Sequence, residues 1–484
     1  MLYSGQMKDN AKPVCSGARS VGIEQLPAQI PAEGIVGEIE QFLRHMIEQM
    51  PPDPAETTRS GPGRPRILPS MCLWTGLLVC VLQGFSSQRA LWRLLNRGNF
   101  WFYPRFPVTD QAVYKRLETE GVAPMQRLFN QVTQVLAHRL APLEDNDLAP
   151  FATGVWALDQ TTLDQIARTL PPLRQVPRGD AQLLPGKLSA LYNIRAQQWK
   201  HIQHIESPTQ NDKVAARDML AVLQEQGIAK GSLILADLGY FGFEWFDWLT
   251  EHKMWWVSRL RAKTSYEVIH TLYEGRDEAG HTYSDCIVWL GAYRADKAAN
   301  AVRLVSFWQE KGKNKTHYQY ITNVLDPKQM GMLDIARVYA RRWDIEMAFK
   351  VVKRELGLHM LWSAKPVLIQ QQVWAVLTIS QILKALQMEI AARAGVDLFD
   401  VSLPLLVEYV PRLAYRGEDP VAVFVEQGRE LGFIRPSRRT MIRAPEVDAD
   451  KIVPMPANMQ LALVRQARYA HRNCGPRSHP VSSN

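Results

Sequence analysis

The chain of 484 residues has only five cysteines, and no two of them form a Cys-x-x-Cys pair. Cysteine and histidine spacings typical of a zinc site are also lacking, so a reducing cytoplasm is the expected location. Long apolar runs are scarce too. The run over residues 71–82 is too short to span a bilayer, and the first ten residues lack the features of a signal peptide. Neither export nor membrane insertion is expected.

The composition is that of an ordinary globular protein, with 46% hydrophobic and 22% charged residues. A chain of this length predicts two or three domains, because single domains rarely exceed about 250 to 300 residues. The formal net charge is +9. This excess of basic residues favours a polyanionic partner such as nucleic acid.

The sequence of the N-terminal part predicts a disordered or loosely attached segment followed by helices. Residues 1–30 mix Gly, Pro, Ser and charge without periodicity, which indicates a disordered or loosely attached segment. Residues 31–150 are expected to form a helical DNA-binding region, with a first amphipathic helix at 35–50 and a Pro-rich basic linker at 51–70. Within the linker, Gly63-Arg64-Pro65-Arg66 resembles the core of an AT-hook, in which Arg64 and Arg66 would enter a minor groove. An incidental basic linker is the alternative.

Residues 70–140 read as a helical series that ends in a segment resembling a helix-turn-helix. Thr109 or Asp110 can cap a helix that displays Lys115 and Arg116, the candidate DNA contacts of this region. A plain helical bundle is the alternative, because helix-turn-helix patterns are short and common. A domain boundary is expected at 143–150.

The pattern changes to alternating strands and helices at about residue 151. A strand at 155–158 ends at Asp159, two strands occupy 187–205, a helix covers 213–226, and a strand at 233–236 ends at Asp237. This order is typical of an RNase H-like α/β fold, in which the first and fourth strands are neighbours. Asp159 and Asp237 would then emerge side by side. Aspartate also commonly ends strands for structural reasons, and Asp164 is a rival for the first position.

A helix predicted from 332 to 356 combines an apolar stripe with a polar one. Four polar residues lie within roughly 60° of one another around an ideal helix axis; they are Tyr339, Arg342, Glu346 and Lys353. The apolar stripe lies beside them, so the polar stripe borders the core, whereas Arg341, Asp344 and Glu355 are expected to face solvent. A carboxylate flanked by Arg, Lys and Tyr in this place suits metal-bound phosphate.

The spacing Tyr339-x2-Arg342-x3-Glu346-x6-Lys353 resembles the Tyr-Arg-Glu-Lys signature of DDE transposases of the bacterial insertion-sequence-four group. The segments Asp159-Gln-Thr-Thr-Leu and Asp237-Leu-Gly-Tyr-Phe resemble the two aspartate motifs of that group, with Gln160 in place of a frequent small residue. The resemblance covers about residues 60 to 400. It implies a catalytic core at 151–360 in which Asp159, Asp237 and Glu346 act together, while Tyr339, Arg342 and Lys353 hold DNA phosphates.

Short β-type runs between 261 and 324 indicate an antiparallel insertion inside the core. The resembling group has such an insertion here, and uses one of its aromatic residues to stack on a base flipped out of the transposon end. Tyr318 stands at the matching place, with Trp308 and Trp289 as alternatives. A role in the sheet core is the other interpretation of Tyr318.

Three convergent carboxylates repel one another without a cation, and hard oxygen ligands select Mg²⁺, for which Mn²⁺ may substitute. The resemblance thus implies a cytoplasmic, nucleoid-associated bacterial transposase. It would cut transposon-end DNA and join it to target DNA, working as a homodimer in a synaptic complex. A metal-dependent nuclease of the same fold and a non-catalytic, transposase-derived DNA-binding protein are the alternatives.

The C-terminal part is expected to be helical at 361–434, with a strongly apolar core helix that stops at Gly395. Residues 435–484 form a basic tail. Its arginines would touch DNA or nothing; they are Arg438, Arg439, Arg443, Arg465, Arg468 and Arg472.

Overall fold

The computed structural model describes most of the chain from residue 68 onwards. The described ranges are 68–97, 106–166, 170–178, 180–207, 209–210, 212–291, 297–311, 314–437, 439 and 442–463. The expected helix at 35–50 and the candidate contacts Arg64 and Arg66 lie outside these residues, as do the arginines of the tail at 438, 465, 468 and 472.

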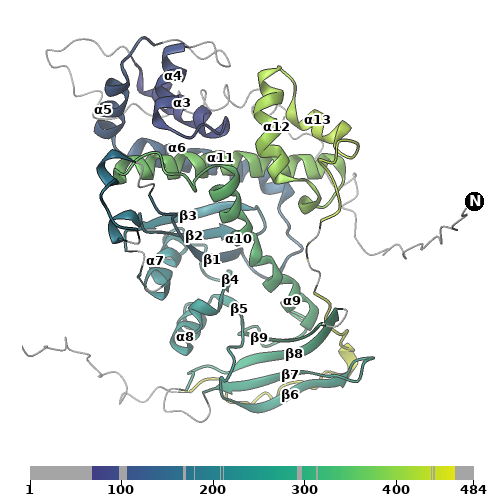
Figure 1. Cartoon of the computed structure of the whole chain (residues 1–484). Coiled ribbons are helices and arrows are strands. Elements are labelled where there is room, and N and C mark those ends of the chain that lie inside the picture. The colour runs from purple at the N-terminus through teal and green to yellow at the C-terminus, as the bar shows by residue number, and fades with distance from the viewer. Residues whose placement is uncertain are drawn as a thin grey trace, which may run out of the picture.

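The described part of the chain begins with four helices, which lie at one end of the molecule (Figure 1). They are α3 (Ser70–Leu82), α4 (Gln88–Arg97), α5 (Asp110–Glu120) and α6 (Ala123–Leu140). Thr109 caps α5, since its Oγ1 accepts a hydrogen bond from the amide of Ala112 at 3.2 Å. The side chain of Arg116 does not stand free on this helix. It bonds to Glu120 and Ser70 and is largely buried, whereas Lys115 is exposed.

The central element is one sheet of nine strands in the order β3-β2-β1-β4-β5-β9-β8-β7-β6. Its first half contains β1 (Val155–Thr162), β2 (Lys187–Asn193), β3 (Gln198–Ile205), β4 (Leu233–Ala236) and β5 (Trp255–Arg259). β1, β4 and β5 run parallel, while β2 and β3 are antiparallel neighbours on the other side of β1. The connections include α7 (Asp212–Glu225) and α8 (Phe243–Glu251).

The second half of the sheet is antiparallel and stands at the end of the molecule opposite α3 to α5 (Figure 1). It contains β6 (Tyr266–Arg276), β7 (Thr282–Leu290), β8 (Val302–Lys311) and β9 (Asn314–Thr322). β9 pairs antiparallel with β5, which makes the two halves continuous. Short 3₁₀ turns complete the chain: Ala141–Leu143, Pro171–Leu173, Ala181–Leu183, Leu238–Tyr240, Leu398–Asp400 and Ala449–Lys451.

Strand alternation divides the core between the two faces of the sheet. Val155 and Ala157 of β1 pack with Leu233 and Leu235 of β4 in the larger cluster, together with α6 and α11. Trp156 and its neighbours of opposite parity pack against α7 and α8 in a second cluster. Because Asp159 and Asp237 have the same parity as Ala157 and Leu235, both belong to the face of the larger cluster.

The single helix predicted from 332 to 356 is in fact three pieces. They are α9 (Met332–Arg341), α10 (Trp343–Lys350) and a π-helical turn over Val351–Glu355. Arg342, between α9 and α10, keeps helical φ and ψ of −52° and −33°, but its amide bonds to Tyr339 O at 3.1 Å, only three residues back. The π turn instead places one extra residue in its hydrogen-bonded ring. A helical period read from the sequence cannot show either interruption.

The prediction that Arg341 and Asp344 face solvent is wrong. The side chain of Asp344 is 0% exposed and that of Arg341 is 17% exposed, because the β2–β3 turn and the chain near residues 399 and 439 cover this side of α10. The apolar stripe of the same segment is buried as predicted, and Glu355 is exposed.

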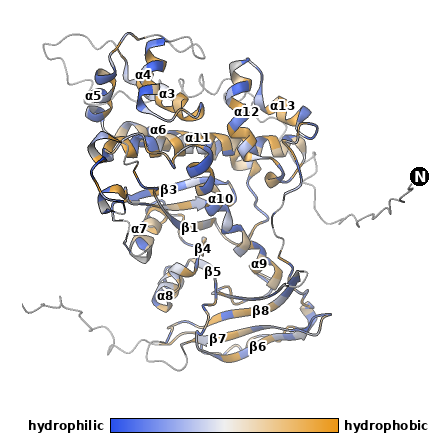
Figure 2. Ribbon diagram, viewed as in Figure 1, coloured by the Kyte–Doolittle hydropathy of each residue, from blue (hydrophilic) through white to orange (hydrophobic). Residues whose placement is uncertain are grey.

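The C-terminal helices are α11 (Pro366–Ala394), α12 (Leu403–Tyr415) and α13 (Pro420–Gln427). α11 ends at Gly395, which has φ +62°. Among the described helices it alone is long and apolar enough to cross a membrane, and 94% of its most apolar stretch is buried inside the protein. Figure 2 shows its hydrophobic residues in orange, where it packs on α6 and α3 as the core helix that the sequence predicts.

Residues 442–463, here called the C-terminal strap, run to the antiparallel half of the sheet (yellow in Figure 1). The amide of Val453 bonds to Leu272 O at 2.8 Å, and that of Leu463 bonds to Ala299 O at 2.7 Å. The strap's apolar side chains cover a small cluster on β6 and β7 that includes Trp289. This part of the expected basic tail is therefore a structural cover.

Candidate active site

Asp159 and Asp237 are brought together by the register of two parallel strands. Leu158 of β1 is paired with Ala236 of β4, so the next residue on each strand is one of the two aspartates. β1 itself continues past Asp159 to Thr162 along β2, which differs from the prediction that the strand ends there. The two carboxylates thus leave neighbouring strands side by side and on the same face.

Burial dominates the electrostatics of Asp159. It raises the pKa of this carboxyl from 3.8 to about 7. The Gln160 amide, which donates to Oδ1 at 2.8 Å, and the charge of Arg342 both oppose this rise, while the charges of Asp237 and Glu346 add to it. The three predicted carboxylates are therefore close enough to influence one another.

The other two carboxylates each have a local partner. Asp237 caps the 3₁₀ turn Leu238–Tyr240, with Oδ1 accepting from the Gly239 amide at 2.8 Å. Glu346 lies on α10, which packs on β1, and its Oε1 is 2.6 Å from NH1 of Arg342. Arg342 is itself buried, and its Nε–H has no hydrogen-bond partner within the described part of the chain. This leaves a buried N–H group next to Glu346 that could donate a hydrogen bond to a phosphate oxygen.

A row of aromatic rings connects this site to the antiparallel strands. Tyr318 and Tyr320 lie on the same face of β9, with ring centroids 6.1 Å apart. The ring centroid of Tyr320 is 5.3 Å from that of Tyr339 of α9. Tyr318 is half-buried at the end of this row. Trp308, one of its alternatives, projects from the opposite face, and Trp289 is buried under the C-terminal strap. Trp289 shares the sheet face of Tyr318, because Ile287 two residues earlier pairs with Arg303, which pairs with Thr322, but its side chain is buried under the strap. Tyr318 is therefore the one of the three candidates that lies in the row of rings leading to Tyr339.

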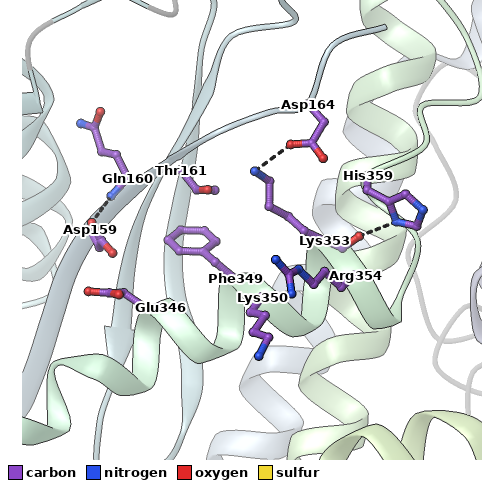
Figure 3. Close-up of a pocket in the computed structure, with 10 residues that line it drawn as sticks. All are labelled: Asp159, Gln160, Thr161, Asp164, Glu346, Phe349, Lys350, Lys353, Arg354 and His359. Carbon is purple, nitrogen blue, oxygen red and sulfur yellow. Dashed lines mark hydrogen bonds and ion pairs between the residues drawn. The ribbon is translucent and has the colours of Figure 1, made fainter. Parts of the chain in front are cut away.

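A cleft of about 740 Å³ runs from Asp159 and Glu346 along α10 and the π turn, and Asp237 is not among its lining residues. Figure 3 shows Asp159 and Glu346 at one end of it, with Lys353, Asp164, Arg354 and His359 at the other. Lys353 does not point at the carboxylates, because its Nζ pairs with Asp164 at 2.9 Å. Asp164, the rival of Asp159 in the sequence, is 45% exposed and belongs to the basic end of the cleft.

The carboxylates as they lie do not form a finished metal site. Over the residues that the structure describes, no group of three or more His, Cys, Asp or Glu side chains stands in an arrangement that could hold a metal ion. Three carboxylates repel one another without a cation, and each here is turned to its own partner: Gln160, Gly239 or Arg342. Their carboxylate oxygens are nevertheless the kind of ligand that a hard cation such as Mg²⁺ takes.

Comparisons with known proteins bear on this part of the chain. Residues 184–382 match the family described as transposase DDE domain. This stretch of the chain is therefore similar to transposase DDE domains. The match includes Asp237 and Glu346, and Asp159 lies just before it.

A curated relative is the transposase for insertion sequence element IS231F of Bacillus thuringiensis subsp. israelensis, which is 22% identical over 289 residues. That match covers 51% of this chain, and the chain spans 59% of the relative's length. A solved structure, the cryo-EM structure of the piggyBac transposase synaptic complex with hairpin DNA, aligns with 10% identity over 89% of this chain and 86% of that one, at a TM-score of 0.35.

Three residues that line the cleft were not singled out by the sequence analysis. Lys350, Arg354 and His359 line its basic end, although the helical period gave no reason to group them. His359 is fixed there by its Nδ1, which bonds to Lys353 O at 2.8 Å. The cluster of basic residues after Glu346 was visible in the sequence, and all of those up to His359 line the cleft.

Proposed function

We propose that the protein is a transposase of the insertion-sequence-four group that cuts the ends of a bacterial insertion sequence and joins them to target DNA. The observation that carries this proposal is the register of β1 with β4, from which Asp159 and Asp237 leave side by side, together with Glu346 of α10, which lines the same cleft as Asp159. The match to the transposase DDE domain supports the same reaction class.

The strand arrangement supports an RNase H-like core over residues 151–360. Three parallel strands, β1, β4 and β5, are flanked by the antiparallel strands β2 and β3, with helices on both faces. We interpret β6 to β9 as the insertion of the resembling group, because they lie in the chain between Asp237 and Glu346. The helices before residue 150 would bind DNA, with Lys115 exposed for contact and Arg116 available only after release from Glu120.

Asp159, Asp237 and Glu346 would hold Mg²⁺ or Mn²⁺, whose chemistry there is to activate water or a 3′-hydroxyl and to neutralise charge on the scissile phosphate. Arg342 pairs with Glu346, and its buried Nε–H has no hydrogen-bond partner among the described residues. Lys353 would exchange Asp164 for a DNA phosphate, and Tyr339 would close the site beside Arg342. Tyr318 would stack on an unpaired base. Two copies, one for each transposon end, would form the synaptic complex.

The test begins with the inverted repeats that flank the gene, which supply the end DNA. Glu346→Gln keeps the side chain's size but removes one negative charge, so cleavage in Mg²⁺ should collapse while affinity for end DNA is kept or raised. Arg342→Ala and Lys353→Ala should instead weaken end binding and make its salt dependence shallower by about one unit each.

Glu355→Gln is the matched control, because Glu355 is an exposed carboxylate of the same segment and should leave both cleavage and binding unchanged. Normal cleavage by Glu346→Gln would refute the catalytic assignment. Cleavage without joining to target DNA would favour the nuclease, and tight end binding without cleavage by the unmodified protein would favour the non-catalytic DNA-binding protein.

A further inference from the structure

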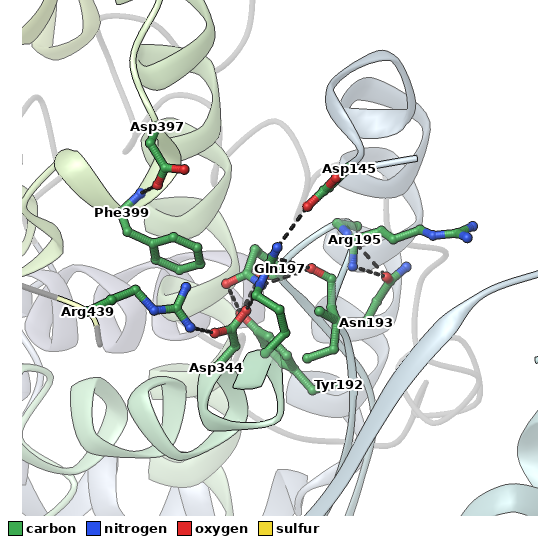
Figure 4. A network of polar contacts seen from close by, with 12 residues as sticks. Asp145, Tyr192, Asn193, Arg195, Gln197, Asp344, Asp397, Phe399 and Arg439 are labelled. Carbon is green, nitrogen blue, oxygen red and sulfur yellow. Dashed lines mark hydrogen bonds and ion pairs between the residues drawn. The ribbon is translucent and has the colours of Figure 1, made fainter. Parts of the chain in front are cut away.

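The first turn of α10 contains a buried polar cluster centred on Asp344 (Figure 4). Its Oδ2 accepts hydrogen bonds from Arg341 Nε at 2.7 Å and from Gln197 Nε2 at 2.8 Å. Its Oδ1 accepts from NH2 of Arg439, the one donor to that oxygen among the described residues. A fully buried carboxylate requires such partners, because burial without them is costly.

Arg439 reaches this cluster from a segment 95 positions later in the chain. Its guanidinium lies over the ring of Phe399, 3.6 Å from the centroid. The backbone just before it is held to the same 3₁₀ turn, since the amides of Arg435 and Ser437 bond to Asp400 at 2.9 and 2.8 Å. Arg439 is thus placed by a cation–π contact, an ion pair and an anchored backbone.

Positive charge surrounds Asp344 on several sides. Lys384 of α11 is buried beside it, 3.1 Å from Gln387 Oε1, and Arg341 continues to Asp145 at 2.7 Å. Burial lowers the pKa of Lys384 to about 8, Asp344 opposes this change, and Arg439 adds to it. Asp344 therefore accepts a hydrogen bond from Arg439 within a buried cluster that also contains the positively charged side chains Arg341 and Lys384.

The chain beyond Arg439 continues as the C-terminal strap on β6 and β7. Its apolar residues Met455, Met459 and Leu461 pack on the cluster that contains Trp289, and its backbone bonds to Leu272 and to the chain before β8. The contact at Arg439 therefore stands, along the chain, between α10, which carries Glu346, and the strap's contacts on β6 and β7.

We propose that Arg439 is a positioning residue, which fixes the first turn of α10 through Asp344 and so sets the place of Glu346. Asp344 and Glu346 are two residues apart, so they lie on nearly opposite sides of one rigid helix, and a shift at one moves the other. The part of this inference that concerns cleavage rests on the proposed function. A misplacement of about 1 Å in a catalytic group can cost on the order of a hundredfold in rate.

The test compares Arg439→Gln, Arg439→Lys and the control Arg443→Gln, which removes the same charge from an exposed side chain four residues later. Hydrogen exchange of amides in residues 343–350 is measured first, in the full chain without DNA. Arg439→Gln should speed this exchange about tenfold through loss of a charge-assisted hydrogen bond. Arg439→Lys should have a smaller effect, and the control none.

The second measurement is the cleavage rate at saturating end DNA, with end affinity measured separately. Arg439→Gln should lower the rate at least about tenfold and change affinity less than about twofold, with partial rescue by Arg439→Lys. Unchanged exchange in α10 would overturn the proposal. Faster exchange with unchanged cleavage would also overturn it, since Arg439 would then serve stability alone. If the unmodified protein cuts no DNA, the proposed function fails, and the exchange data still decide whether Arg439 fixes α10.

Discussion

Replacing Asp159 with Asn should make the metal-free protein more stable above pH 7. The carboxyl of Asp159 has a pKa of about 7 in the folded protein, against 3.8 as its ordinary value. Between these two values the unfolded chain has lost the proton that the folded protein keeps. Stability conferred by this group is therefore complete below about pH 4 and is lost as the pH rises to about 7.

The size of the effect follows from the shift of about three pH units, each of which corresponds to about 1.36 kcal/mol. The free energy of unfolding of Asp159→Asn, relative to the unmodified protein, should therefore rise by up to about 4 kcal/mol between pH 4 and pH 8. The amide of Asn keeps an oxygen for the Gln160 N–H but carries no charge to desolvate, so the gain has a defined cause.

Urea denaturation in the presence of a chelator, at several pH values from 4.5 to 8, measures this difference. Asp164→Asn is the matched control, because that carboxylate lines the same cleft but is 45% exposed. Adding Mg²⁺ at pH 8 should stabilise the unmodified protein and not Asp159→Asn. Parallel stability curves for the two proteins across the pH range would refute the reasoning.

Three further variants test other parts of the molecule. Asp164→Asn frees Lys353 from the ion pair that it must otherwise give up to bind a DNA phosphate, so end DNA should bind more tightly, measured by fluorescence anisotropy. Asp285→Asn strands the fully buried Arg303, and urea denaturation should show a loss of about 3 to 5 kcal/mol; a loss below about 1 kcal/mol would mean that water reaches the site. Tyr318→Ala should slow cleavage of paired ends more than cleavage of ends already unpaired there, and equal effects in the two substrates would assign Tyr318 to sheet packing.

Much of the sheet could be predicted because its signals are local. Short β-rich runs bounded by turns indicated the strands at 155–158, 187–205 and 233–236 and those between 261 and 324, and an aspartate directly after an apolar strand marked Asp237. The adjacency of Asp159 and Asp237 required only the neighbouring placement of two strands, which the order of elements implied. The structure adds the register, in which Leu158 pairs with Ala236.

The surroundings of Glu346 could not be predicted in the same way. A helical period assumes a regular α-helix throughout, but the helix tightens at Arg342 and widens into a π turn after Lys350. The period also says which residues share a side, and not what covers that side. Asp344 is buried by Gln197 and Arg439, which are distant in sequence, so no local pattern could reveal it.

The buried aspartates of this protein separate into two kinds by the partners they have. Asp247 accepts from two backbone amides and a side-chain amide, Asp285 accepts twice from Arg303, and Asp344 accepts from three side chains. Such saturation offsets the cost of burial and indicates a structural role.

Asp159 is different, since its hydrogen bond within the described chain comes from the next residue and two further carboxylates raise its pKa. A purely structural carboxylate arranged in this way would lower the stability of the folded protein at neutral pH, and no stabilising contact would offset the loss. This loss of stability is explained if the folded protein binds a cation there, because a cation would favour the ionised form of all three carboxylates. The same comparison explains why removing Asp247 or Asp285 should destabilise the protein, whereas removing the charge of Asp159 should stabilise the metal-free form and abolish its function.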